Sequence, residues 1–254
     1  MLGENMSGVL LKTEKITKSF GSVQALRGVD LEVTEGLITA VVGDNGSGKS
    51  TLIKILSGNI DPDGGVIRIG AECHAKLSVS QSIGAGIRTV YQDLSLDNCK
   101  NSWENVFLGN EILKGGLFLD RKTMERETRM LLDRLEICIP DLKLPVRNLS
   151  GGQRQGLAIA RALRSPGKLL LLDEPTSAMG IREVHNTLEL LRRLKGEGLT
   201  LLLISHNLHQ VFDIADRVVV MRAGRCIADV MTAESSPESI HTMILEREQR
   251  EVGI

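Results

Sequence analysis

One stretch decides the fold of this chain: Gly43-Asp44-Asn45-Gly46-Ser47-Gly48-Lys49-Ser50-Thr51, which matches the phosphate-loop pattern G-x-x-x-x-G-K-S. The apolar run 37–42 before it predicts a buried strand. Apolar residues at helical spacing after it predict a helix that stops near Gly58. Glycines let the backbone wrap closely around a polyphosphate, and the loop N–H groups and the helix N-terminus stabilise its charge. A chance glycine turn would not have both flanks, so we expect a nucleotide site.

Four side chains in and beyond this stretch suit phosphate chemistry. Lys49 can reach the β- and γ-phosphates, and the Ser50 hydroxyl can ligate Mg²⁺. Further along, the apolar run 169–172 predicts a buried strand that ends in Asp173 and Glu174, the form of a Walker B strand. The first carboxylate can hold Mg²⁺ and the second can orient or deprotonate an attacking water. On its own the pair could simply end a strand; after a phosphate loop, the catalytic interpretation is favoured.

Composition excludes several classes of protein. The 254 residues carry a net charge of −1 and only one Trp, one Tyr and four Phe, which argues against a nucleic-acid partner. The four cysteines are Cys73, Cys99, Cys138 and Cys226; they lie far apart, and we expect reduced, partly buried thiols rather than a metal site. The apolar run 9–11 is too short for a signal peptide, and no run approaches the about 18 residues of a membrane span. We expect a cytosolic protein that needs a spanning partner if it works at a membrane.

Predicted strands alternate with predicted helices along the chain, which favours a mostly parallel sheet with helices on both faces. The strands are expected at 10–33 around Gly21, 66–69, 89–91, 169–172 and 199–204, with a hairpin of 217–221 and 226–230. One helix is expected after the N-cap Asp120, with the apolar face Met124, Leu131, Leu132 and Leu135. A second is expected from Ser150 to about Arg164, and a third has the apolar face Ile181, Val184, Leu188, Leu191 and Leu194. A short helix is expected at 208–215 and a charged helix from Glu238. Residues 98–101 and 114–116 suggest irregular surface structure. The helix-rich stretch 93–164 interrupts the alternation and predicts a separate lobe.

The sequence Leu149-Ser150-Gly151-Gly152-Gln153 contains a capping box, because Ser150 and Gln153 are spaced as N-cap and N3. It also resembles the signature of the ATP-binding-cassette (ABC) ATPases, and the resemblance extends over essentially the whole chain. In that family this helix start binds the γ-phosphate of ATP held by a second copy of the domain. Hydroxyl, glycines and helix N-terminus form an anion site, in agreement with that role. The resemblance implies an α/β P-loop NTPase with a RecA-like core, an N-terminal antiparallel β part and a helical lobe.

Three further residues match positions with roles in this family. Gln92, after Thr89-Val90-Tyr91, corresponds to the glutamine that touches Mg²⁺ and the attacking water; otherwise it is a polar residue that ends a strand. His206 corresponds to the histidine that contacts the γ-phosphate; otherwise it is a structural histidine. Phe20 corresponds to the aromatic residue that stacks on adenine; otherwise it is a core residue. The resemblance thus implies ATP and Mg²⁺, with Ser50, Gln92 and Asp173 around the metal.

Two glycines depart from the usual pattern. After Pro175-Thr176-Ser177-Ala178-Met179 the family usually has an aspartate, whereas this chain has Gly180. This change puts in doubt the usual communication between two ATP sites. Gly156 lies inside the helix that Ser150 opens, where glycine costs about 1 kcal/mol relative to alanine, and close packing is the reason that we expect.

Four parts of the sequence in and around the motifs resemble those of the ATPase subunits of bacterial monosaccharide importers: 89–94, 105–109, Gly180 and 204–208. This implies a second copy of the chain, integral membrane permease subunits and, indirectly, a sugar-binding protein, with the chain peripheral at the cytoplasmic face of the inner membrane. We expect a single ABC domain over 8–231, with a helical subdomain at about 93–165, and a helical tail over 232–254. The alternatives are a soluble ABC ATPase that remodels or assembles proteins, and a regulatory subunit that binds nucleotide without hydrolysis.

Overall fold

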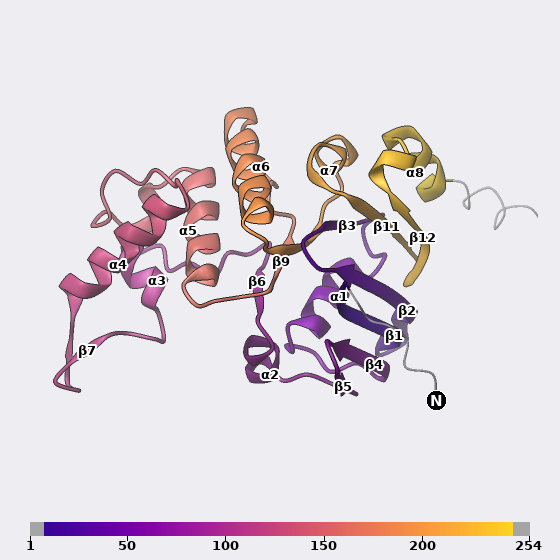
Figure 1. Cartoon of the computed structure of the whole chain (residues 1–254), viewed down its shortest axis with the longest axis horizontal. Helices are drawn as coiled ribbons and strands as arrows, with labels where there is room; N and C mark the ends of the chain where they lie inside the picture. Colours follow the sequence, from indigo (N-terminus) through magenta and orange to yellow (C-terminus); the bar gives the residue numbers. More distant parts are fainter. Residues whose placement is uncertain (1–7, 246–254) are drawn as a thin grey trace, which may run out of the picture. The chain divides into compact units, whose positions relative to one another are not determined.

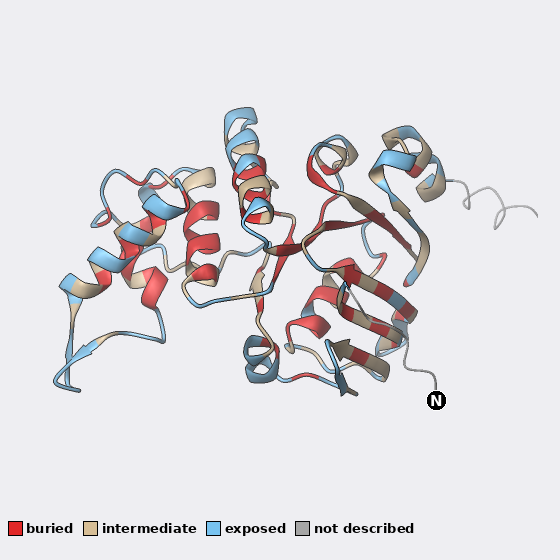
Figure 2. Cartoon of the chain, viewed as in Figure 1, coloured by how far each residue is buried: buried red, intermediate tan, exposed pale blue. Residues whose placement is uncertain are grey.

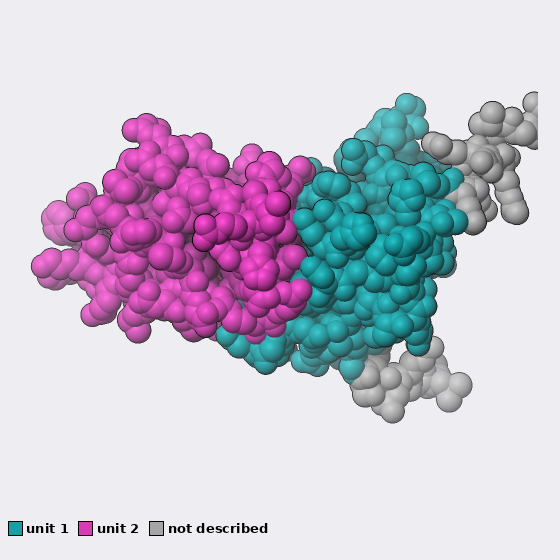
Figure 3. Space-filling model, turned by 90° about the horizontal axis from the view of Figure 1, so that it is seen from above, with its two compact units in different colours: residues 1–89, 167–174, 194–254 teal, residues 90–166, 175–193 magenta. Residues whose placement is uncertain are grey.

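The structure is a computed structural model that describes residues 8–245. These residues form two compact units, shown in different colours in Figure 3. The described residues of unit 1 are 8–89, 167–174 and 194–245, and those of unit 2 are 90–166 and 175–193. Among residues 8–245, no helix has both the length and the apolar character needed to cross a membrane. Each unit is described by itself below.

The strands of residues 8–245 form three sheets, and Figure 1 labels most of these strands. A four-stranded antiparallel sheet has the order β2-β1-β4-β5, and a six-stranded sheet has the order β12-β11-β3-β10-β9-β6. The bounds are β1 Val9–Phe20, β2 Val23–Thr34, β3 Ile38–Val42, β4 Gly64–Ile69, β5 Glu72–His74, β6 Ile87–Val90, β7 Leu113–Lys114, β8 Phe118–Leu119, β9 Leu169–Asp173, β10 Thr200–Ile204, β11 Arg217–Arg222 and β12 Arg225–Met231.

The helices lie between the strands in the chain. They are α1 Lys49–Leu56, α2 Val79–Gly84, α3 Ser102–Phe107, α4 Arg121–Arg134, α5 Gly151–Leu163, α6 Ile181–Gly196, α7 Leu208–Ile214 and α8 Pro237–Leu245, with short 3-10 helices η1 Val146–Asn148 and η2 Thr232–Glu234. Within unit 1, Figure 1 shows α1 on one side of the six-stranded sheet and α7 and α8 on the other. The α/β fold with a mostly parallel sheet is therefore confirmed.

The centre of the six-stranded sheet is the core of unit 1. Every residue of β3, β9 and β10 is buried (Figure 2), which explains why the sequences of these strands are almost entirely apolar. β10 pairs in parallel with both of its neighbours, and Ile204 is opposite Val41 on one side and Asp173 on the other. The carboxyl ends of three strands thus meet at one edge, where ligands bind in open α/β sheets.

Several predictions of local structure are wrong. Residues 114–116 are not irregular throughout: Lys114 belongs to a strand, Leu113–Lys114, that pairs with Phe118–Leu119, while Gly115 and Gly116 form the exposed turn with their positive φ. Ile181 is 91% exposed rather than buried, since it is the first residue of α6 and precedes the buried face. Three cysteines, Cys73, Cys99 and Cys138, are exposed, and only Cys226 is partly buried.

Two predicted elements have different ends. The strand expected at 89–91 is β6 and ends at Val90. The described part of the tail helix, α8, contains Glu238 as its single carboxylate, and the remainder of the charged helix expected there lies outside the described residues.

Candidate functional site

The phosphate loop connects β3 to α1, and its glycines fit closely against neighbouring strands. Gly43 and Gly48 have φ values of +145° and +103°, which side chains rarely tolerate. A Cβ on Gly43 would lie 1.9 Å from the Met221 carbonyl oxygen, and one on Gly48 would lie 2.6 Å from the Ala25 carbonyl oxygen. Gly46, at φ +81°, has open space instead. The loop is therefore held by backbone on one side and open at its tip.

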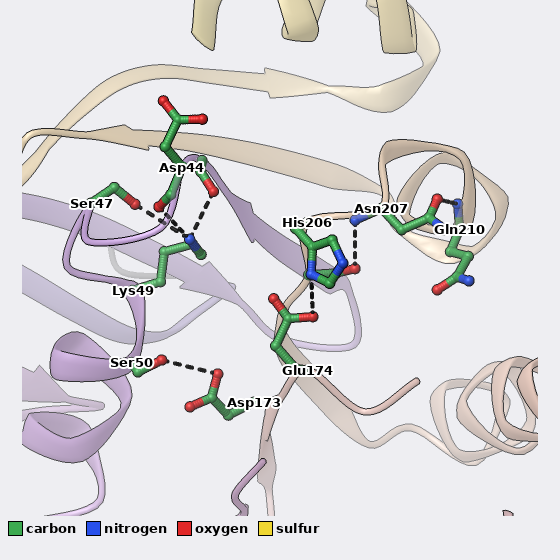
Figure 4. A network of polar contacts seen from close by, with 11 residues as sticks. Asp44, Ser47, Lys49, Ser50, Asp173, Glu174, His206, Asn207 and Gln210 are labelled. Carbon is green, nitrogen blue, oxygen red and sulfur yellow. Dashed lines mark hydrogen bonds and ion pairs between the residues drawn. The ribbon is translucent and has the colours of Figure 1, made fainter. Parts of the chain in front are cut away.

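The Lys49 ammonium lies inside the curve of this loop (Figure 4). Its Nζ donates to the carbonyl oxygens of Gly43 at 2.7 Å and Asp44 at 2.8 Å, and to the Ser47 hydroxyl at 3.4 Å. Burial lowers the pKa of Lys49, and the nearby carboxylates, Glu174 first, oppose that shift. The loop thus holds a buried cation at its centre, as an anion site requires.

Ser50 and Asp173 form an oxygen pair at the start of α1. The Ser50 hydroxyl donates to Asp173 Oδ1 at 3.2 Å, and Asp173 is the last residue of β9. Asp173 is 5% exposed, and burial raises its pKa, a shift that the Ser50 hydrogen bond and Lys49 partly oppose. Hydroxyl and carboxylate oxygens are ligands that Mg²⁺ prefers.

Glu174 and His206 face each other across the ends of β9 and β10 (Figure 4). His206 Nδ1 lies 2.8 Å from Glu174 Oε2. The Glu174 side chain is 13% exposed, whereas that of His206 is 67% exposed. Glu174 adopts φ +52°, and its N–H donates to the Ile204 carbonyl at 3.0 Å. A non-glycine residue with positive φ is held by its surroundings, which is common at functional sites.

Phe20 also belongs to unit 1 and is the last residue of β1. Its side chain is not core: it is 48% exposed, and Lys18 Nζ lies 5.6 Å from the ring centroid. Of the other predicted residues of this stretch, Asn45 lies beside Gly46 at the loop tip and Thr51 lies in the first turn of α1. The structure therefore brings Lys49, Ser50 and the two acids together in one unit.

The other predicted residues belong to unit 2. Gln92 lies exposed in the bend after β6. Ser150 caps α5 as predicted: its hydroxyl accepts from the Gln153 N–H at 3.3 Å, and Gln153 Oε1 accepts from the Ser150 N–H at 3.0 Å. The two glycines between them, Gly151 and Gly152, form the first turn of α5, whose N–H groups have no partner within the helix.

The sequence motifs missed two residues that contact these segments. Arg161 of α5 donates to the carbonyl oxygens of Leu94 at 2.5 Å and Ser95 at 2.8 Å, and so fixes the loop after Gln92. Glu183 of α6 accepts from the Gly152 N–H at 3.2 Å. Both act on backbone groups of segments distant in sequence, so no motif indicates them; the one signal that could have indicated Glu183 is its place in the first turn of a predicted helix.

Comparison with known proteins agrees with this geometry. The family model of the ABC transporter matches residues 26–177. The xylose/arabinose import ATP-binding protein of Sulfolobus acidocaldarius is 43% identical over 231 residues, which cover 91% of this chain and 92% of the relative. The fructose import ATP-binding protein of Rhizobium meliloti is 42% identical over 223 residues, with coverage of 85% and 86%. A ribose import ATP-binding protein of Yersinia pestis is 40% identical over 94% of this chain, which spans about half of that relative, 46%.

Solved structures show the same fold. A nucleotide-free ATP-binding cassette from an ABC transporter superposes with a TM-score of 0.80 at 28% identity, over 97% of this chain and 99% of the other. An ABC transporter cassette in its ADP conformation has a TM-score of 0.78 at 26% identity, with the same coverage. Family model, relatives and fold agree, so this chain belongs to the ABC transporter family, as one of its ATP-hydrolysing cassettes.

Proposed function

We propose that this chain powers the uptake of a sugar through separate membrane permease subunits, as a peripheral subunit at the cytoplasmic face of the membrane. Two relatives named as sugar import ATP-binding proteins support this, because they align with this chain over most of both lengths. A sugar-binding protein that delivers the cargo to the permease is part of the same proposal. Cargo contacts belong to those other subunits, so the ATPase chain itself selects no particular sugar.

In this proposal the phosphate loop, 43–51, and Lys49 hold the β- and γ-phosphates of ATP, and Phe20 stacks on the adenine. Ser50 and Asp173 hold Mg²⁺ with Gln92. The pair suits the ion because Asp173 is penalised by burial as an anion, and a cation beside it offsets that penalty. When bound, Mg²⁺ neutralises charge that develops on the β- and γ-oxygens.

The Glu174–His206 pair carries the hydrolytic part of the proposal. Its two side chains lie 2.8 Å apart at the edge of the sheet where the phosphate loop begins. Glu174 accepts a proton from, or orients, the water that attacks the γ-phosphate. His206, largely exposed, contacts that phosphate and holds the Glu174 carboxylate in position. Both roles need groups fixed before ATP arrives, and the positive φ of Glu174 is a sign of such fixation.

The complete catalytic unit in this proposal is a dimer of two chains. The capping turn Ser150–Gln153 is a second anion site, and each copy offers it to the ATP held by the other. With the two copies head to tail, the phosphate loop of one copy and the Ser150–Gln153 turn of the other both contact the same ATP.

Glu174→Gln tests the proposal. The amide keeps the size of the side chain but takes no proton, so hydrolysis should fall by at least about a hundredfold while ATP binding persists. The dimer should then accumulate with Mg·ATP, measured by light scattering. Glu189→Gln, which removes one exposed carboxylate from α6, is the matched control and should hydrolyse ATP normally. Turnover at the native rate by the Glu174→Gln protein would refute the assignment.

A further inference from the structure

The Glu183 carboxylate occupies the N-terminal turn of α5. Its Oε1 accepts from the Gly152 N–H at 3.2 Å, and its Oε2 accepts from the Gly180 N–H at 3.2 Å. A hydrogen bond with the Ser150 side chain is also among the contacts that lower the pKa of Glu183, second to that with Gly152. Ser150 can make it because its oxygen only accepts from Gln153, which leaves its proton free to be donated. Unit 2 therefore already holds an anion at this turn.

The two glycines of the turn fit this carboxylate. A Cβ on Gly151 would lie 3.3 Å from Glu183 Oε2, and one on Gly152 would lie 3.1 Å from Glu183 Cβ. Both distances are tighter than ordinary van der Waals contact. Side chains at these positions would therefore push Glu183 away from the α5 N–H groups, and the glycines permit its close approach.

Capping of α6 explains only one of these three contacts. Gly180 directly precedes α6, and its carbonyl accepts from the Val184 N–H at 3.0 Å, so Glu183 reaches back to the Gly180 N–H as in a capping box. That role uses Oε2. It does not require Oε1 to bind Gly152, which belongs to another helix. A glycine at position 180 also favours this contact. An aspartate there would place a second negative charge close to Glu183, whose Oε2 lies 4.0 Å from the position of a Cβ on residue 180.

We propose that Glu183 is an internal competitor for the anion site of α5, which it fills until the γ-phosphate of ATP on a second copy displaces it. This rests on the proposed function, in which Ser150–Gln153 receives that phosphate. Before ATP binds, the carboxylate accepts from the Gly152 N–H, and the loss of this hydrogen bond is a cost that ATP binding must offset. Only chains whose α5 anion site is free can receive the γ-phosphate, so the fraction of such chains sets the apparent affinity for ATP in dimer formation. Glu183 therefore raises the ATP concentration needed to form the dimer.

The experiment compares Glu183→Gln with its parent in a Glu174→Gln background, because hydrolysis is then blocked in both. Glutamine keeps the size and can still cap α6, but it has no charge to hold the anion site. Dimer formation is followed by light scattering against Mg·ATP concentration. The half-saturating ATP concentration should fall by about threefold or more. Glu189→Gln removes the same charge from an exposed position of α6 and should leave this concentration unchanged.

The outcomes separate the two ideas. An equal or higher ATP requirement for Glu183→Gln overturns the competitor role and leaves the ATP-driven dimer intact. A Glu174→Gln protein that stays monomeric at every ATP concentration overturns the proposed dimer, and the competitor role with it. Should Glu183→Gln not fold, Glu183→Asp gives the same test, because its shorter side chain keeps the charge but withdraws it from the Gly152 N–H. Its ATP requirement should also fall.

Discussion

Asp173 shows at the residue scale how the site trades stability for chemistry. Burial raises its pKa, so the folded chain binds this proton more tightly than the unfolded chain does. The ionised carboxylate therefore costs stability above the raised pKa, and the cost fades as the pH falls through it towards 3.8, the ordinary value. Asp173→Asn removes this cost and keeps an oxygen for the Ser50 hydroxyl.

We therefore expect Asp173→Asn, without nucleotide or Mg²⁺, to melt roughly 2–4 °C higher at pH 7, which corresponds to about 1 kcal/mol in a domain of this size. The gain should shrink as the pH is lowered, and hydrolysis should be lost. Calorimetric scans at several pH values measure the first effect and phosphate release the second. Asp44→Asn is the control, since Asp44 is exposed on the loop and its loss should not change the melting temperature. A lower melting temperature for Asp173→Asn at pH 7 would contradict this reasoning.

In unit 1, side chains that sequence patterns assign to one site do lie at one edge of the sheet. Lys49 donates to the phosphate loop and Ser50 to Asp173, because loop, helix and strand follow directly from local pattern. The positive φ of Glu174 has no counterpart in the sequence, because Glu174 is held by a hydrogen bond to the Ile204 carbonyl, which is distant in sequence. Glu183 was missed for a related reason: its contact joins two helices that no spacing rule connects. The assigned roles of the site residues stay predictions until the variants are measured.

At the scale of elements, Gly156 allows α5 to pack closely against the segment that follows α4. A Cβ there would lie 2.8 Å from Ile137 Cγ2, which follows α4 and belongs to the same unit. Alanine would gain about 1 kcal/mol of helix propensity, but overpacking typically costs about 1–3 kcal/mol. We expect Gly156→Ala to lower the melting temperature, because the clash is with a branched carbon near the backbone that cannot swing away.

A double-mutant cycle with Ile137→Ala measures this contact. Ile137→Ala should be destabilising alone, and the double variant should lose less stability than the two single variants lose in total. Thermal melts of the four proteins give the coupling. A Gly156→Ala protein more stable than the native chain would show that helix propensity outweighs the contact.

Elements with a visible apolar pattern were predicted correctly, and elements without one were not. β3, β9 and β10, of five residues each, were evident as largely apolar runs, and α5 from its capping box and apolar face. α3 has the same type of capping box, Asn101 with Glu104, but its six residues are too few for a helical period to be visible. The hairpin of β7 and β8 has only two residues in each strand, too few to show an alternation. A buried strand is thus recognised from fewer residues than a helix with one buried face.

At the scale of the whole molecule, the prediction concerns the proposed membrane partner of this ATPase. The two relatives that align over most of both lengths are named as sugar import ATP-binding proteins. We expect the Glu174→Gln protein, held in its ATP state and recovered from gently solubilised membranes of the source cell, to carry a polytopic membrane protein at stoichiometric level. Mass spectrometry identifies that partner, and the permease and its binding protein would indicate the cargo.

Lys49→Ala, which should bind ATP weakly, controls for adventitious capture. Recovery of the chain with soluble proteins alone, despite a trapped dimer, would instead favour an ABC ATPase that remodels or assembles proteins.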